Sequence, residues 1–250
     1  MQICYASEPA PEHENEDYLL ASGSWCVVLD GATERPDIDS GCSHGVRWYV
    51  SRLALSVGAG LETRPGIDLR EALEGAIRET CQLHSTTCDL ANPDSPSSVV
   101  VIVRERQADV DYLVLADSTV VLDVSDEGPL IVTDDRTAHL PSRTVEAVRS
   151  LRNSAQGFWV ASTAPEAAGH ALTGSVPKAR IRRGLVLTDG AARLVDRYGW
   201  SWTDVLDLAQ RSGPSSVITH VRRAELSAGP TRGKKHDDAT VACIGFTAPG

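Results

Sequence analysis

The sequence lacks a closely spaced cysteine pair. Its six cysteines are scattered without a Cys-x-x-Cys motif, and several lie in apolar runs, where a thiol packs as a small hydrophobic group. We therefore expect neither a structural zinc site nor a disulfide framework. An apolar run long enough to span a membrane is also missing, as is the basic and then apolar start of a secretory signal. These absences predict a protein of the reducing cytoplasm.

Positive charge is scarce. The chain has 24 lysines and arginines against 34 aspartates and glutamates, for a formal net charge of -10. Nucleic acid and anionic membranes are repelled by such a protein unless a basic patch attracts them, so we expect neither as a partner. A basic run, Arg232 to Lys235, could meet an anionic substrate, but a solvated loop explains it better.

Features that separate domains are missing as well. The sequence has no internal repeat, no low-complexity tract and no convincing linker. A chain of 250 residues that is 42% hydrophobic can bury one sizeable core. We expect a single domain over residues 1–250.

Two spacings of apolar residues indicate the secondary structure. Period-two or continuous apolar runs predict strands at 25–29, at 180–190, at 238–246 and in an antiparallel meander over 97–135. Helical spacing is found at 42–60, 68–90, 142–153, 164–172, 201–211 and 215–228. Strands and helices do not alternate regularly, which favours an α+β domain of antiparallel sheets covered by helices.

Acidic residues gather at the ends of these strands. The groups are Glu16 with Asp17, then Asp30, Asp189, and Asp237 with Asp238. Carboxylates at strand ends can converge at one edge, where their mutual repulsion is relieved by a cation. Ligands that are all oxygen suit magnesium or manganese better than zinc. The alternative is that each aspartate caps a helix or lies in a turn, which is the commoner role of a lone Asp-Gly.

Five motifs in order carry a resemblance to a known family. They are "NED", "VVLDGAT", "YLVLADSTVV", "LVLTDGAARLVD" and "HDDATVACI". In this order they resemble the metal-dependent type 2C protein phosphatases, the PPM family, over nearly the whole chain. The resemblance implies a four-layer α-β-β-α sandwich of two antiparallel sheets. It also implies hydrolysis of phosphate monoesters, foremost phosphoserine and phosphothreonine, by attack of a water that bridges two metal ions.

The resemblance assigns ligands for two magnesium or manganese ions and for a third, more weakly held ion. Asp30 would bridge the two ions, with Asp189 and Asp237 completing the catalytic carboxylates. The resemblance places seven residues at the metals: Glu16, Asp17, Asp30, Gly31, Asp117, Asp189 and Asp237. Of these, Gly31 would offer its carbonyl, Asp17 would lie just outside the direct ligands, and Asp117 would serve the third ion.

The chain departs from the family at the phosphate clamp. Where the family has an arginine, this sequence has Glu12, and Asp238 stands where the family usually has asparagine. An acidic group would repel phosphate unless it points away. His44 and Arg47, at the start of a predicted helix, could bind the substrate instead, because a helix N-terminus attracts phosphate. The alternative is a capping histidine and a solvated arginine.

Two functions remain open at this point. The first is a phosphatase that acts on a phosphoprotein or on a small phosphorylated molecule. The second is a catalytically weak or inactive regulatory module that keeps the fold but binds a partner, which the missing arginine would favour. A pure binding module has no need of a full acidic set, so we prefer the enzyme.

Overall fold

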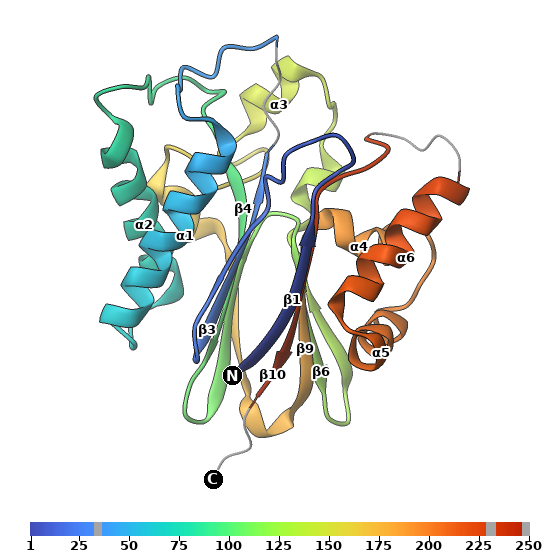
Figure 1. Ribbon diagram of the computed structural model, residues 1–250. Coiled ribbons are helices and arrows are strands. Elements are labelled where there is room, and N and C mark those ends of the chain that lie inside the picture. The colour runs from blue at the N-terminus through green and yellow to red at the C-terminus, as the bar shows by residue number, and fades with distance from the viewer. Residues whose placement is uncertain (33–36, 229–233, 247–250) are drawn as a thin grey trace.

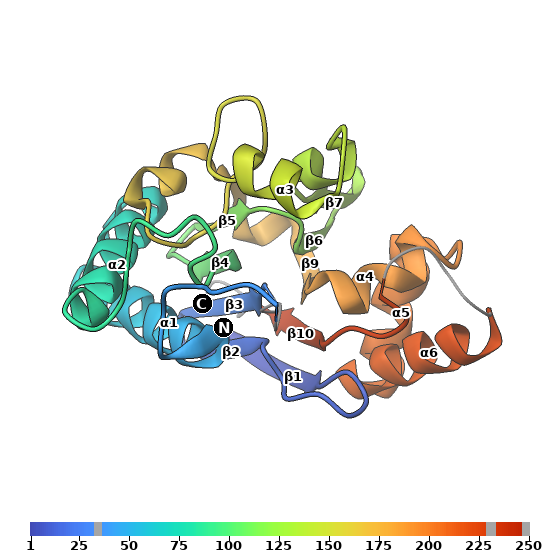
Figure 2. The same ribbon diagram turned by 90° about the horizontal axis from the view of Figure 1, so that it is seen from above.

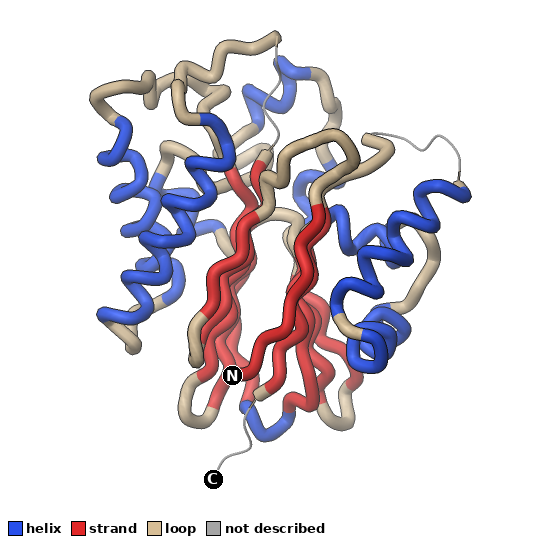
Figure 3. The backbone as a smooth tube through the Cα atoms, in the orientation of Figure 1, coloured by secondary structure: helices blue, strands red, loops and turns tan. Residues whose placement is uncertain are grey.

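Two antiparallel sheets form the middle of the molecule, and helices cover their outer faces (Figures 1 and 3). The computed structural model describes residues 1–32, 37–228 and 234–246. In spatial order, the first sheet consists of β1 (Gln2–Glu8), β10 (Ala239–Gly245), β9 (Ile181–Leu187), β6 (Thr119–Val124) and β7 (Gly128–Val132). The second consists of β2 (Tyr18–Ala21), β3 (Trp25–Gly31), β4 (Ser98–Glu105), β5 (Asp109–Leu115) and β8 (Leu172–Pro177).

The helices lie in two layers on opposite sides of the sheets (Figure 2). The second sheet is covered by α1 (Gly45–Thr63) and α2 (Leu69–His84). The first sheet is covered by α4 (Asp189–Asp196), α5 (Trp202–Ser212) and α6 (Pro214–Ser227). The remaining helical segments are α3 (Val145–Leu151) and three 3₁₀ turns, Asp135–His139, Pro165–His170 and Lys178–Arg180. The predicted α-β-β-α sandwich is confirmed.

The layered core explains why the central strands read as continuous apolar runs. In β3, Cys26 and Val28 face the other sheet, whereas Val27 and Leu29 pack beneath the helices α1 and α2. Successive side chains of a strand point to opposite faces, so a strand covered on both sides must be apolar at every position.

The predicted meander over 97–135 is wrong in one respect. Its four strands are present, but β4 and β5 pair in one sheet while β6 and β7 pair in the other. The chain crosses between the sheets at Ala116 to Ser118, and Ala116 has a positive φ of 69° there. A left-handed residue turns the chain sharply within one short connection. Asp117 is therefore carried on the crossing itself.

The structure corrects other details of the predicted elements. The segment 164–172 contains a 3₁₀ turn rather than an α-helix, and Asp189 begins α4 instead of ending a strand. The strands β1, β2 and β8 were not expected from the sequence. Within the described ranges, none of the helices is long and apolar enough to cross a membrane.

The packing of α1 gives a direct test of this architecture. Leu53 is fully buried against the second sheet, whereas Leu55 on the same helix is 46% exposed. We expect Leu53→Ala to lower the free energy of unfolding by about 2–5 kcal/mol, because it leaves a cavity in the core. The control Leu55→Ala should change it by less than about 0.5 kcal/mol. Urea unfolding followed by fluorescence measures both, and equal effects would contradict the assigned burial.

Candidate metal centre

Acidic side chains converge where the two sheets end. β1 rises from the N-terminus in Figure 1, so the β1–β2 loop with Glu16 and Asp17 lies at the top of the sandwich. β10 runs antiparallel to β1, which brings Asp237 and Asp238, just before β10, to the same end. Asp30 near the end of β3, Asp117 on the crossing and Asp189 after β9 complete the group.

The charges of these carboxylates act on one another. Burial raises the pKa of Asp30 well above its ordinary value, and the negative charges of Asp17, Asp189, Asp117 and Asp237 raise it further. Such coupling requires that all five lie within a short distance. The structure thus brings together the aspartates that the sequence placed in one site.

Asp189 is less strongly affected. Burial, followed by the charges of Asp237 and Asp117, raises its pKa to about 7, while Arg193 and Lys234 oppose the rise. Without a bound cation, this carboxyl therefore changes between its protonated and ionised forms near neutral pH.

Asp17 is held by two threonines from the opposite sheet. Its Oδ2 accepts hydrogen bonds from Thr188 Oγ1 at 2.9 Å and Thr240 Oγ1 at 2.6 Å. Its Oδ1 is buried and has no hydrogen-bond partner among the described residues. Burial raises the pKa of Asp17 to about 8 even though both hydrogen bonds lower it. A buried carboxylate oxygen without a partner fits a nearby cation.

The two aspartates before β10, Asp237 and Asp238, make different contacts. Asp238 accepts backbone N–H bonds from Ala10 at 2.7 Å and Glu16 at 2.6 Å, one on each oxygen. Asparagine, which has a single acceptor atom, could not accept both in this way, so the aspartate fixes the β1–β2 loop.

Asp237 is held by cations instead. Its Oδ2 lies 2.9 Å from Nη2 of the buried Arg193, and its Oδ1 lies 3.1 Å from Nζ of Lys234. Arg193 in turn donates to Glu225 at 2.6 Å. These contacts place a positive charge at the acidic cluster before any metal is added.

Two glycines permit the close approach of the segments. A Cβ on Gly31 would lie 2.4 Å from Cγ1 of Val46 and 2.6 Å from the Glu16 carbonyl oxygen. A Cβ on Gly190 would lie 1.9 Å from the Asp238 carbonyl oxygen. Both distances are shorter than any side chain tolerates, so the Asp-Gly pairs serve close backbone packing rather than turn formation alone.

A cavity of about 620 Å³ opens beside the carboxylates. Glu16, Asp237 and Asp238 line one part of it, and Arg47 and Lys234 bring positive charge to the rim. Glu12 is exposed and is not part of the cavity that the described residues enclose. Its neighbours Pro11 and His13 do line the cavity.

The predicted substrate residues both border the cavity, and each already has a partner. Nη1 of Arg47 lies 2.8 Å from Oε2 of Glu14 in an exposed ion pair. His44 is the N-cap residue of α1, and its Nδ1 lies 3.2 Å from Sγ of Cys88. Arg47 thus remains a candidate for phosphate binding, whereas His44 points its Nδ1 at a sulfur.

Sequence reasoning overlooked one cation in this site, the buried Arg193. It lies within the motif "LVLTDGAARLVD", four residues after Asp189, and this spacing was the available signal. Lys234 and Lys235 of the basic run are exposed, as expected of a solvated loop, and both also line the cavity; Arg232 and Gly233 lie outside the described residues.

Comparisons with known proteins agree with this geometry. A family model described as protein phosphatase 2C matches residues 12–226. The chain belongs to the protein phosphatase 2C family, as the resemblance implied. Among curated proteins, none matches the chain significantly.

Solved structures show the shared fold. The PPM Ser-Thr phosphatase MsPP from Mycobacterium smegmatis, in complex with cacodylate, is 18% identical with a TM-score of 0.63, and the match covers 99% of both chains. Stp1 from Staphylococcus aureus is 12% identical with a TM-score of 0.66, covering 99% of this chain and 95% of that chain. The catalytic domain of PstP, in complex with two manganese ions, is 16% identical with a TM-score of 0.58, covering 97% and 96%.

The buried carboxyls predict how stability depends on pH without added magnesium or manganese. Because the pKa of Asp17 is raised from 3.8 to about 8 in the folded protein, the unfolded chain releases this proton first as pH rises. The free energy of unfolding should therefore fall between about pH 5 and pH 8, by at most about 1.4 kcal/mol per pH unit for this group. In Asp17→Asn the fall should be shallower. Denaturant unfolding across this range measures it, and parallel curves would refute the assignment.

Proposed function

We propose that this protein is a metal-dependent phosphatase that hydrolyses phosphate monoesters, foremost phosphoserine and phosphothreonine in proteins. The observation that carries the proposal is the convergence of buried and half-buried aspartates, whose negative charges raise the pKa of Asp30, beside an open cavity. Membership of the protein phosphatase 2C family supports the same reaction. The regulatory module, which the missing arginine favoured, has no need of a full acidic set and remains the alternative.

The donor set favours magnesium or manganese. Asp30 would contact two ions, Glu16 and the Gly31 carbonyl would complete one of them, and Asp189 and Asp237 the other. Asp117 would contribute to a third. These ligands are all oxygen, which hard cations prefer. Two such ions, when bound, would lower the pKa of a water between them and withdraw charge from the phosphate oxygens.

The remaining residues would orient this constellation and receive the substrate. The hydroxyls of Thr188 and Thr240 donate hydrogen bonds to the carboxylate of Asp17, and the guanidinium of Arg193 donates one to Asp237. Arg47 stands at the rim with an exposed guanidinium, where a substrate phosphate could replace Glu14 as its partner. The volume of the cavity, about 620 Å³, falls within the range of about 300–1,000 Å³ that is usual for ligand pockets.

Removing a ligand carboxylate tests the reaction. Asp30→Asn should lower manganese-dependent hydrolysis of para-nitrophenyl phosphate by about 100-fold or more, since losing one electrostatic contact to a transition state costs about that much. The control is Asp126→Asn, an exposed residue of the β6–β7 turn whose positive φ of 67° suits asparagine. It should keep full activity.

Calorimetry with manganese separates the two possible failures. If the unaltered protein bound manganese but hydrolysed nothing, it would be a regulatory module that keeps its ions. If it bound no manganese near neutral pH, the proposed site itself would be wrong.

The role of Arg47 is tested by its effect on substrate affinity. Arg47→Ala should raise KM for a phosphate monoester roughly tenfold, because it removes a charge-assisted hydrogen bond, and leave manganese affinity unchanged. Arg78 forms a comparable exposed ion pair with Glu74 on α2, and Arg78→Ala is the matched control. An unchanged KM in Arg47→Ala would remove this residue from the substrate site.

A further inference from the structure

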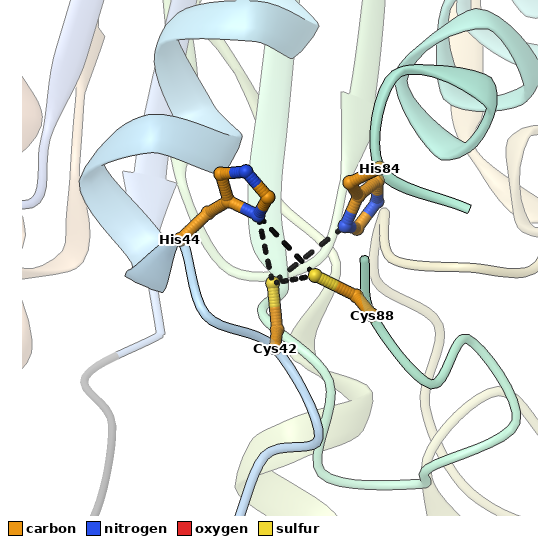
Figure 4. A group of neighbouring side chains, drawn as sticks. All are labelled: Cys42, His44, His84 and Cys88. Atoms are coloured by element: carbon orange, nitrogen blue, oxygen red, sulfur yellow. Dashed lines mark hydrogen bonds between the residues drawn. The ribbon is translucent and has the colours of Figure 1, made fainter. Parts of the chain in front are cut away.

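A second cluster of metal-ligand side chains lies where α1 begins and α2 ends. Cys42, His44, His84 and Cys88 point toward one another there (Figure 4). Each offers one ligand atom, and these four atoms all lie within 4.8 Å of one another. None of the four belongs to the acidic group at the strand ends.

Four of the distances between these atoms lie close to the edges of a tetrahedron around zinc. Sγ of Cys88 lies 3.2 Å from Sγ of Cys42 and 3.2 Å from Nδ1 of His44. Sγ of Cys42 lies 3.8 Å from Nδ1 of His44 and 3.6 Å from Nδ1 of His84. With Zn–S of about 2.3 Å and Zn–N of about 2.0–2.1 Å, tetrahedral geometry requires about 3.8 Å between the two sulfurs and about 3.5–3.6 Å between a sulfur and a nitrogen. The contacts of Cys42 with the two histidines are near these values, and Cys88 would move away from Cys42 by about 0.5 Å on binding the ion.

The burial of His84 is a second observation that favours a metal site at this cluster. This side chain is 1% exposed, and the Nδ1 of its ring lies 3.6 Å from Sγ of Cys42. Trp48 packs against both imidazoles, at ring centroid distances of 4.2 Å from His44 and 5.1 Å from His84. An apolar cover of this kind shields a metal site from water.

The backbone around the cluster is built to keep the two loops together. The amides of Thr87 and Cys88 donate to the His84 carbonyl at 3.1 and 3.0 Å, which turns the chain so that Cys88 faces back toward His84. The amide of Asp89 donates to the carbonyl of Gly41 at 2.8 Å and joins this turn to the segment before α1. Ligands from distant parts of the sequence therefore meet on a framework that exists without the ion.

We propose that Cys42, His44, His84 and Cys88 bind one structural zinc ion. Two thiolates balance the charge of the ion, and two imidazoles complete the four ligands that a structural zinc site uses. The protein fills every position of the tetrahedron, so no position is left open for a substrate. Nitrogen and sulfur ligands also select an ion different from the one that the oxygen ligands of the acidic site prefer.

A zinc ion here would change two expectations from the sequence. The sequence has no Cys-x-x-Cys motif and predicts no structural zinc site, whereas the proposed ligands come from Cys-x-His and His-x₃-Cys spacings. His44 would then hold zinc rather than substrate. Because His44 directly precedes α1 and Arg47 lies in its first turn, the ion would fix the wall of the neighbouring cavity.

A disulfide between Cys42 and Cys88 is the main competing explanation. Their sulfurs lie 3.2 Å apart, well beyond a bond of about 2.05 Å, and a disulfide would leave the two imidazoles without a role. The two explanations predict opposite results for metal content and for free thiols.

Cobalt spectroscopy on the untagged, full-length protein decides between them. Cobalt alone, added to metal-free protein under reducing conditions, should produce a sulfur-to-cobalt charge-transfer band and the strong visible bands of a tetrahedral site. Protein purified without added metal should contain about one zinc per chain, falling to below about 0.1 in Cys88→Ser, since the loss of a ligand costs at least as much affinity as the tenfold or more lost with an outer partner.

Two controls keep the result specific. Cys4→Ser removes an exposed cysteine on β1 and should keep both the zinc and the cobalt bands. Asp30→Asn alters the acidic site and should keep them too, so failure of the proposed phosphatase function would not affect this outcome. If Cys88→Ser fails to fold, the spectrum of the unaltered protein still decides. Cobalt without a sulfur band, or a Cys42–Cys88 disulfide in place of zinc, would overturn the proposal.

Discussion

Repulsion among closely placed carboxylates is the main physical constraint at the end of the sandwich where the acidic residues meet. Asp17, Asp30, Asp117, Asp189 and Asp237 come from both sheets and act on one another through a poorly solvated space. Left alone, such a group favours separation of the segments that carry it. The surrounding structure resists this through the threonine bonds to Asp17, the arginine and lysine beside Asp237, and two glycines that allow tight backbone contact. The fold thus maintains an arrangement that is favourable only when positive charge is supplied.

Much of this could be anticipated from the sequence, for identifiable reasons. The strand at 25–31 is apolar at nearly every position because both of its faces are buried. The helices α1 and α2, within residues 45–84, show helical spacing of apolar residues because one face of each is buried. The acidic residues could be placed in one site because their motifs occur in the order of a known family. Asp238 shows the limit of assigning roles from a family motif. Its carboxylate accepts hydrogen bonds from two backbone amides of the β1–β2 loop, and the motif does not reveal these contacts.

Features formed by distant segments were harder to foresee. β1 has exposed and half-buried positions in no regular order, and β2 has only four residues, so neither gives a clear period. The change of sheet at Ala116 depends on which partners β5 and β6 find, and a local pattern does not contain that information. The cysteine and histidine cluster joins residues 42 and 88, which a search for one compact motif cannot connect.

The crossing at Ala116 to Ser118 has a wider consequence for how the molecule holds together. It is a short connection that leaves one sheet, bears Asp117 at the acidic cluster and enters the other. Asp30 belongs to the second sheet, while Asp189 and Asp237 adjoin strands of the first. Neither sheet alone possesses the full acidic set. Metal ions with ligands from both groups would crosslink the two sheets. A shift of one sheet relative to the other would therefore separate the ligands and lower the affinity for the ions.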